Sequence, residues 1–215
     1  MAAAPPERAS RLARVPTWAL AAVTFVFAAG VSLINAASVS YWTDEAASLS
    51  AARRSLPELW EMLQGIDAVH GLYYAVLHGW ISLVGDSSLA TRSLSALAIG
   101  GTCVGVLLLT IRLVDVRLAI VAAVVAALLP RLTWAGIEAR PAAFTALCAV
   151  WATYLLLVAW SRMKWLTWAA YALVAAVGMF FSIYLALLVV AHAVSTVLVH
   201  RFRSRQTVAM AIAGG

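Results

Sequence analysis

The sequence predicts an all-α fold, a multi-pass bundle of transmembrane helices with two short interfacial helices in its first outer loop. Of the 215 residues, 64% are hydrophobic and 11% are charged, whereas about a quarter of the residues in soluble domains are charged. The apolar residues form runs of about 17–23, each long enough to cross the hydrocarbon core of a bilayer. Many Trp and Tyr residues stand near the ends of these runs, as in interfacial aromatic belts.

The predicted elements follow from the order of these runs. Residues 1–17 form a basic cytoplasmic tail, and residues 18–215 form the transmembrane module. The run 18–37 is longer than the apolar core of a signal peptide, about 7–15 residues, so we interpret it as the first span. The first outer loop covers residues 38–87. Further spans are expected at about 89–111, 118–133, 142–160, 166–181 and 184–199, with the start of another helix at 207–215.

The first outer loop contains signals for two short helices. Ser55 and Glu58 form a capping box, and Gly65 ends the amphipathic segment that follows it. This helix would lie in the interface plane with its apolar face down, or would pack on the protein as an ordinary loop helix. A second helix is expected over 70–84, ended by Gly85. The cap of the next helix is expected at Asp86, Ser87 or Ser88.

Small residues within the apolar runs predict close helix packing. Gly101 and Gly105 have the small-xxx-small spacing that lets two helix backbones approach each other. Cys103 and Cys148 lie inside apolar runs, without nearby metal-ligand spacing, and are expected to be packing residues.

The charge distribution predicts the orientation. The net charge is +6, but the basic residues stand in short clusters between apolar runs, which argues against nucleic-acid binding. Because positively charged loops stay in the cytoplasm, we expect a plasma-membrane protein with its N-terminus inside and its polar site on the extracytoplasmic side. The basic residues expected inside are Arg8, Arg11, Arg14, Arg112, Arg117, Arg162, Lys164, Arg201, Arg203 and Arg205.

Two adjacent carboxylates, Asp44 and Glu45, follow the first predicted span. Side-by-side carboxylates repel each other, which raises one pKa unless a cation or ligand compensates. Ionisable groups at membrane depth are candidates for function, and a carboxylate there can accept the proton of a sugar hydroxyl. Asp44 is therefore the candidate catalytic residue. The alternative is a pair that is simply solvated at the interface.

Asp67 and His70 precede the aromatic pair Tyr73-Tyr74. A single histidine is more often a hydrogen-bonded structural residue, and a metal site needs further ligands. Asp44 and Glu45 could supply those ligands, so a divalent metal stays open as the less favoured alternative, and we predict no cofactor. Aromatic residues such as Tyr73 suit contact with a sugar face or a lipid tail.

Glu138 and Arg140 are the charge pair of the second predicted outer loop. Arginine can hold a phosphate through two parallel hydrogen bonds, although a mutual surface ion pair explains the two residues equally well. The outer face is thus expected to hold acidic residues that can act as a base, a cation that can bind a phosphate, and aromatic side chains that can contact a sugar or a lipid tail.

The order of these motifs resembles the GT-C glycosyltransferases, and most closely the family 39-like enzymes related to protein O-mannosyltransferases, of actinobacterial type. The resemblance covers about residues 38–160. It rests on Trp42-Thr43-Asp44-Glu45, on Asp67-Ala68-Val69-His70-Gly71-Leu72-Tyr73-Tyr74, on the segment from Gly85 to Arg92, and on Glu138-Ala139-Arg140.

The resemblance implies inverting transfer of a sugar, expected to be mannose, from a polyprenyl-phosphate donor to a glycan, lipid or protein acceptor. Asp44 matches the base. The residues matching positions associated with the acceptor and the donor phosphate are Glu45, Asp67, His70, Glu138 and Arg140. The family form Asp-x-His-Pro-Pro-Leu differs here, because the histidine stands one place later and Gly71 replaces the prolines.

Members of this class have more transmembrane helices than the sequence predicts. We therefore expect an N-terminal half, with the missing half, another membrane subunit and membrane lipids as partners. The alternative function is a non-catalytic scaffold or partner subunit that retains the fold. A transporter is disfavoured, because transporters place charged residues near the bilayer midplane.

Overall fold

The computed structural model describes residues 15–34 and 36–213, with the backbone alone for 200–213. This part of the chain is helical and contains no strand, which confirms the predicted all-α bundle. The elements are α2 (Thr17–Leu33), α3 (Thr43–Ala52), α4 (Leu56–Gly65), the 3-10 turn η1 (Ala68–His70), α5 (Gly71–Val84), α6 (Ser88–Leu113), α7 (Val116–Leu128), α8 (Pro130–Ile137), α9 (Ala142–Arg162), α10 (Trp165–Phe181) and α11 (Leu185–Ala213).

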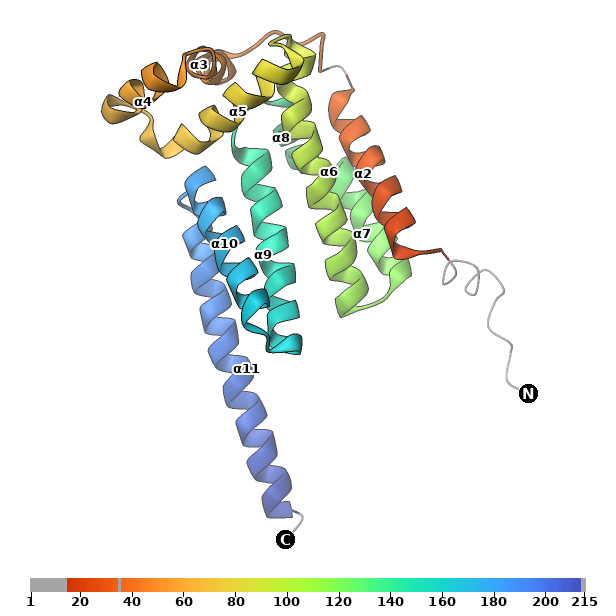
Figure 1. The fold of residues 1–215 in the computed structure, drawn as a ribbon. Helices are drawn as coiled ribbons and strands as arrows, with labels where there is room; N and C mark the ends of the chain where they lie inside the picture. The colour runs from red at the N-terminus through yellow and green to blue at the C-terminus, as the bar shows by residue number, and fades with distance from the viewer. Residues whose placement is uncertain (1–14, 35, 214–215) are drawn as a thin grey trace, which may run out of the picture.

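The long helices form a bundle that is covered at one end (Figure 1). Helices α2, α6 and α7 pack together on one side, and α9, α10 and α11 form the other side. Helix α6 also packs against α9, which joins the two sides. Helices α3, α4 and α5 lie across one end of the bundle, which we call the site end.

Two described helices, α6 and α9, are long and apolar enough to cross a membrane. Helices α7 and α8 qualify together as a third span, although they meet at an angle of 57°. Helices α2 and α10 and the Leu185–Val199 part of α11 are apolar but shorter. At about 1.5 Å per residue, the 17 residues of α2 extend for about 25 Å, close to the hydrocarbon thickness.

The structure differs from the expected spans in three places. The run 118–133 is not one helix, because Pro130 cannot continue α7 and instead begins α8. Helix α2 ends at Leu33, short of residue 37. Helix α11 continues without a break through residues 200–206. The predicted tail residues 1–14 and the last two residues lie outside the described part.

The first outer loop contains three α-helices instead of the two predicted: α3 was not predicted, whereas α4 and α5 begin and end within one residue of their predicted bounds. Glu58 accepts hydrogen bonds from the backbone nitrogen of Ser55 at 2.9 Å and from its hydroxyl at 2.7 Å. In α4, Leu59 is buried against the α5 side of the molecule, whereas Trp60 is 69% exposed. Helix α4 therefore packs on the protein through one face and exposes apolar side chains on another. The hydroxyl of Ser87 caps α6 by accepting from the backbone nitrogen of Ala90 at 3.3 Å.

Small residues allow α6 to approach α9 closely. A Cβ atom added at Gly101 would lie 2.8 Å from Leu147 Cδ1, and one added at Gly105 would lie 2.5 Å from Val150 Cγ1. The predicted packing role of these glycines is thereby confirmed. Cys103 and Cys148 are free and buried, as expected.

Two hydrogen bonds to one histidine join helices α9, α10 and α11. The imidazole of His192 in α11 lies 3.2 Å from the hydroxyl of Thr153 in α9 and 3.2 Å from the hydroxyl of Tyr171 in α10. Such interhelical hydrogen bonds are worth about 0.6–2 kcal/mol in membranes. They hold α11 against α9 and α10.

We expect Gly105→Leu to lower stability by about 1–3 kcal/mol, because the new side chain overlaps Val150 at the α6–α9 contact. The matched control is Gly30→Leu, since a Cβ atom at Gly30 meets nothing within 4 Å. Unfolding in a detergent titration measures both. Equal stability of the two variants would contradict the packing described here.

Candidate active site

A buried ion pair between Glu45 of α3 and Arg92 of α6 organises the site end. The Nε and Nη2 atoms of Arg92 donate to the two carboxylate oxygens of Glu45 at 2.9 and 2.8 Å. Both side chains are only 2% exposed. A bidentate arginine–carboxylate pair fixes orientation as well as distance.

The remaining donors of Arg92 hold the loop between α2 and α3. Nη1 donates to the carbonyl oxygens of Ala36 at 2.6 Å and Val39 at 2.7 Å, and Nη2 donates to that of Ser40 at 3.3 Å. An arginine has five N–H donors, so each of them has an acceptor here. Arg92 therefore ties three carbonyls of this loop to α6, including that of the buried residue Ala36.

Glu45 also reaches the segment between α8 and α9. Its Oε1 atom accepts from the backbone nitrogen of Ala139 at 3.0 Å. Because Arg140 is the next residue, this bond sets the position from which the Arg140 side chain departs. The ion pair thus connects α3, α6, the 36–40 loop and the α8–α9 turn.

A polar cavity of about 160 Å³ lies beside this ion pair. It receives side chains from α3, η1, α5 and the start of the α9 segment, which are far apart in the sequence. Its lining residues are Asp44, Ala47, Ser48, Asp67, His70, Tyr74, Arg140 and Pro141. Four of the predicted site residues, Asp44, Asp67, His70 and Arg140, are therefore brought together.

Asp44 and Arg140 form the charged pair of the cavity. Arg140 Nη1 lies 2.9 Å from Asp44 Oδ2, with the side chains 31% and 47% exposed, respectively. The guanidinium also lies 5.4 Å from the centre of the Trp42 ring, within the range of a cation–π contact. Within the described residues, neither Asp44 Oδ1 nor the remaining Arg140 donors have a protein partner, so both groups can contact a ligand.

Asp67, His70 and Tyr74 line the cavity from η1 and α5. Asp67 has a φ of 56°, a left-handed conformation that aspartate tolerates better than most residues. Its Oδ2 accepts from the Tyr74 hydroxyl at 3.3 Å, and its Oδ1 lies 4.0 Å from His70 Nδ1. Burial and the Asp67 carboxylate raise the pKa of Tyr74 to about 12, so its phenol remains a donor at neutral pH.

Two of the predicted ligand contacts, Glu45 and Tyr73, do not line the polar cavity. Glu45 is buried and its carboxylate already accepts from Arg92 and Ala139, so it positions other residues and leaves no free oxygen for substrate. Tyr73 is fully buried in the core beneath the cavity, and the adjacent Tyr74 faces the cavity instead. Rotation of about 100° per residue around a helix separates the two tyrosines.

Glu138 lies outside the polar cavity. It is 6% exposed and lines a separate, mainly apolar cavity of about 230 Å³ that also contains Trp42 and Trp134. Arg140 pairs with Asp44 and not with Glu138, so the mutual ion pair that was the alternative interpretation of these two residues is not the contact found. Burial raises the pKa of the Glu138 carboxyl above its ordinary value.

No metal-binding cluster is found in the described part of the chain, where no three His, Cys, Asp or Glu side chains group suitably. The cavity does contain Asp44, Asp67 and His70, but Asp44 pairs with Arg140 and Asp67 accepts from Tyr74.

Sequence reasoning missed the roles of Arg92, Tyr74 and Trp42. A single arginine placed four residues after the start of an apolar helix was a usable signal, because buried charges in membrane segments need a partner. The identity of that partner, 47 residues away, was not readable from spacing.

Arg92→Met should lower stability by about 3–5 kcal/mol, because it leaves the buried Glu45 carboxylate without its cation. The control is Arg53→Met, which breaks the exposed Arg53–Asp86 pair and should cost less than about 1 kcal/mol. The unfolding midpoints of Arg92→Met and Arg53→Met, each compared with that of the wild type, measure the two losses of stability. Similar losses would show that the buried pair has no special role.

Glu138 should make stability fall with rising pH. Its pKa is raised in the folded state, so above about pH 4.5 the unfolded chain releases this proton while the folded chain retains it. Glu138→Gln should therefore gain stability relative to wild type as the pH rises towards 7. Glu58→Gln is the opposite control, since hydrogen bonds from Ser55 lower the pKa of Glu58. A stability gain in Glu138→Gln that is the same at every pH would refute the raised pKa of Glu138 in the folded state.

Comparison with known proteins identifies the family. Residues 71–214 match the family described as dolichyl-phosphate-mannose-protein mannosyltransferase. No curated protein and no solved structure matches the chain. The matched segment includes Arg92, Glu138 and Arg140, whereas Asp44 and Glu45 precede it. Since the match covers more than half of an all-helical, apolar chain, this membrane protein belongs to the dolichyl-phosphate-mannose-protein mannosyltransferase family, a group of GT-C-type glycosyltransferases.

Proposed function

We propose that this protein transfers a mannosyl group from a polyprenyl-phosphate donor to a hydroxyl group of an acceptor. The observation that carries the proposal is the Asp44–Arg140 pair in an accessible polar cavity. It places a carboxylate and a guanidinium, the two groups that glycosyl transfer from a phosphate needs, within one ligand-sized space. The family description supports a dolichyl-type lipid phosphate as donor and a protein as acceptor.

Asp44 acts as the general base. Its Oδ1 atom is free to accept a hydrogen bond from the acceptor hydroxyl, which is the geometry that proton transfer requires. The acceptor oxygen forms a bond to the anomeric carbon as the bond from that carbon to the phosphate oxygen breaks. The proton passes to Asp44, and the bonding electron pair leaves with the lipid phosphate. Attack from the face opposite the phosphate inverts the anomeric configuration.

Arg140 stabilises the departing phosphate. Only one of its terminal nitrogens is occupied by Asp44, and the guanidinium is held from behind by Trp42. Its other N–H groups can contact the phosphate oxygens, where charge develops in the transition state. A phosphate leaves without a strong acid, so this cation supplies the stabilisation and the mechanism requires no resident metal.

Asp67, His70 and Tyr74 bind the sugar or the acceptor. The Asp67 carboxylate and the Tyr74 hydroxyl are already joined, which fixes one wall of the cavity. His70 Nδ1 has no hydrogen-bond partner within the described residues. It can therefore complete a contact with a substrate hydroxyl or with the phosphate.

The cavity is proposed to face the extracytoplasmic side of the plasma membrane. Along the sequence, the basic residues expected at the opposite end outnumber those at the site end ten to five. Because loops rich in Lys and Arg favour the cytoplasm, the site end is assigned outside. The acceptor is accordingly an exported protein, glycan or lipid.

Asp44→Asn should reduce sugar transfer by about 10²–10⁴-fold, because the amide cannot accept the acceptor proton. The measurement is transfer of labelled mannose from polyprenyl-phosphomannose in membranes that contain the longest native form. Asp86→Asn is the control, since Asp86 is an exposed carboxylate outside the cavity.

Equal transfer by wild type and Asp44→Asn, at equal abundance, would remove Asp44 as the base. Absence of transfer in every sample would instead favour the non-catalytic scaffold that retains the fold.

A further inference from the structure

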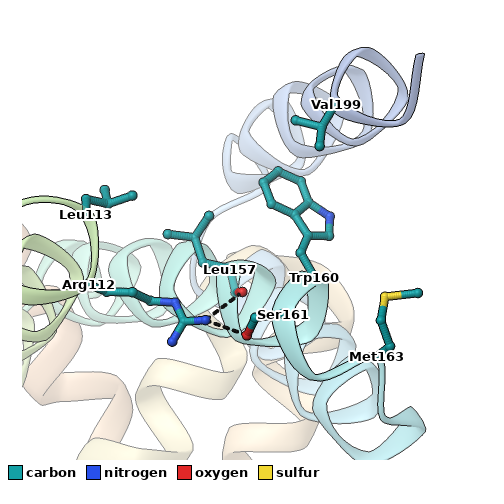
Figure 2. Close-up of a pocket in the computed structure, with 7 residues that line it drawn as sticks. All are labelled: Arg112, Leu113, Leu157, Trp160, Ser161, Met163 and Val199. Carbon is teal, nitrogen blue, oxygen red and sulfur yellow. Dashed lines mark hydrogen bonds between the residues drawn. The ribbon is translucent and has the colours of Figure 1, made fainter. Parts of the chain in front are cut away.

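A third pocket lies at the end of the bundle opposite the polar cavity. It has a volume of about 220 Å³ and is formed where α6, α9 and α11 come together (Figure 2). Arg112 provides its charge, and the other walls are mainly apolar. The lining residues are Arg112, Leu113, Leu157, Trp160, Ser161, Met163 and Val199.

Arg112 is anchored but not neutralised. Its Nη2 atom donates to the carbonyl oxygen of Leu157 at 3.2 Å and to the hydroxyl of Ser161, as the dashed lines in Figure 2 show. These bonds fix the guanidinium against α9. They leave the Nε and Nη1 donors without an acceptor among the described residues. An oriented cation with free donors is suited to a phosphate group.

The surroundings of the pocket are basic and lack available carboxylates. Arg117, Arg162 and Lys164 stand at the same end, and none of them has an acidic partner in the described part of the chain. The nearby Asp115 instead caps α7, accepting from the backbone nitrogens of Arg117 at 2.7 Å and Leu118 at 2.9 Å. The local field therefore favours an anion.

We propose that this pocket binds the headgroup of an anionic phospholipid. The phosphodiester would lie on Arg112, and the glycerol and upper acyl chain would contact Leu113, Leu157 and Met163. The pocket lies at the ends of membrane-spanning helices, which is the depth of the headgroup region, and basic pockets between such helices hold anionic lipids. A free phosphate would leave the apolar walls uncovered, so the lipid is the occupant that fits both halves of the pocket.

The full chain, purified in a neutral detergent, provides the test. Dioleoyl-phosphatidylglycerol and dioleoyl-phosphatidylcholine are added in separate titrations, and the unfolding temperature is recorded. Ligands that bind the folded state raise this temperature. We expect a saturable rise with phosphatidylglycerol that phosphatidylcholine does not reproduce. Arg112→Gln should weaken the apparent affinity about tenfold or more, the effect of losing a charged hydrogen bond.

Arg117→Gln is the matched control, because it removes the same charge from the same end without lining the pocket. It should retain most of the response. Leu113→Glu is a second variant that keeps the anchoring bonds of Arg112. Leu113 is 62% exposed, so folding should tolerate the change while the new carboxylate repels the phosphate.

Three results would overturn the proposal. One is an equal response to both lipids. Another is an equal loss in Arg117→Gln and Arg112→Gln, which would indicate general surface electrostatics. The third is a rise with inorganic phosphate that matches the effect of phosphatidylglycerol, which would make the ligand a free anion. Each lipid response is compared with the same variant in phosphatidylcholine, so a change in basal stability does not affect the conclusion.

Discussion

The buried pair of Glu45 and Arg92 is the interaction on which the site end depends. Two charges at 2% exposure are tolerated only because every arginine donor has an acceptor. Removing either partner leaves an uncompensated charge, so the pair must form for the loop after α2 to close. The pair mainly positions other parts of the chain. The Arg92 side chain of α6 holds α3 and the loop before it, and Glu45 in turn holds the backbone next to Arg140.

This constraint gives two neighbouring carboxylates different tasks. Glu45 points inward to Arg92, while Asp44 reaches the cavity and meets Arg140. The repulsion expected between them is relieved by one arginine for each carboxylate. Environment thus separates a structural carboxylate from a chemically available one, a division that also distinguishes paired carboxylates in other enzymes. At the opposite end, Arg112 has no carboxylate partner among the described residues, and its pocket is the one proposed to take an anionic lipid.

The sequence predicted local features better than it predicted contacts. The all-α bundle, the Ser55–Glu58 cap and the α6–α9 glycine contact could be read from periodicity and spacing. Helix α3 was missed because its start looked like the end of an apolar run. The choice of Tyr74 over Tyr73 depends on the rotation of α5, and the Arg92–Glu45 pairing depends on tertiary packing. The pairing joins residues far apart in the sequence, which no local pattern specifies, whereas the spacing of Tyr73 and Leu77 on α5 was a local signal for the buried face.

The most direct test of this account is a cryo-EM structure of the protein in lipid nanodiscs with a polyprenyl-phosphate sugar bound. The account predicts the phosphate within hydrogen-bonding distance of Arg140, the anomeric carbon facing Asp44, and the Glu45–Arg92 pair unchanged. A donor bound away from this cavity, or Glu45 released from Arg92 to contact the sugar, would contradict it. In either case the buried pair would no longer explain how the site is held.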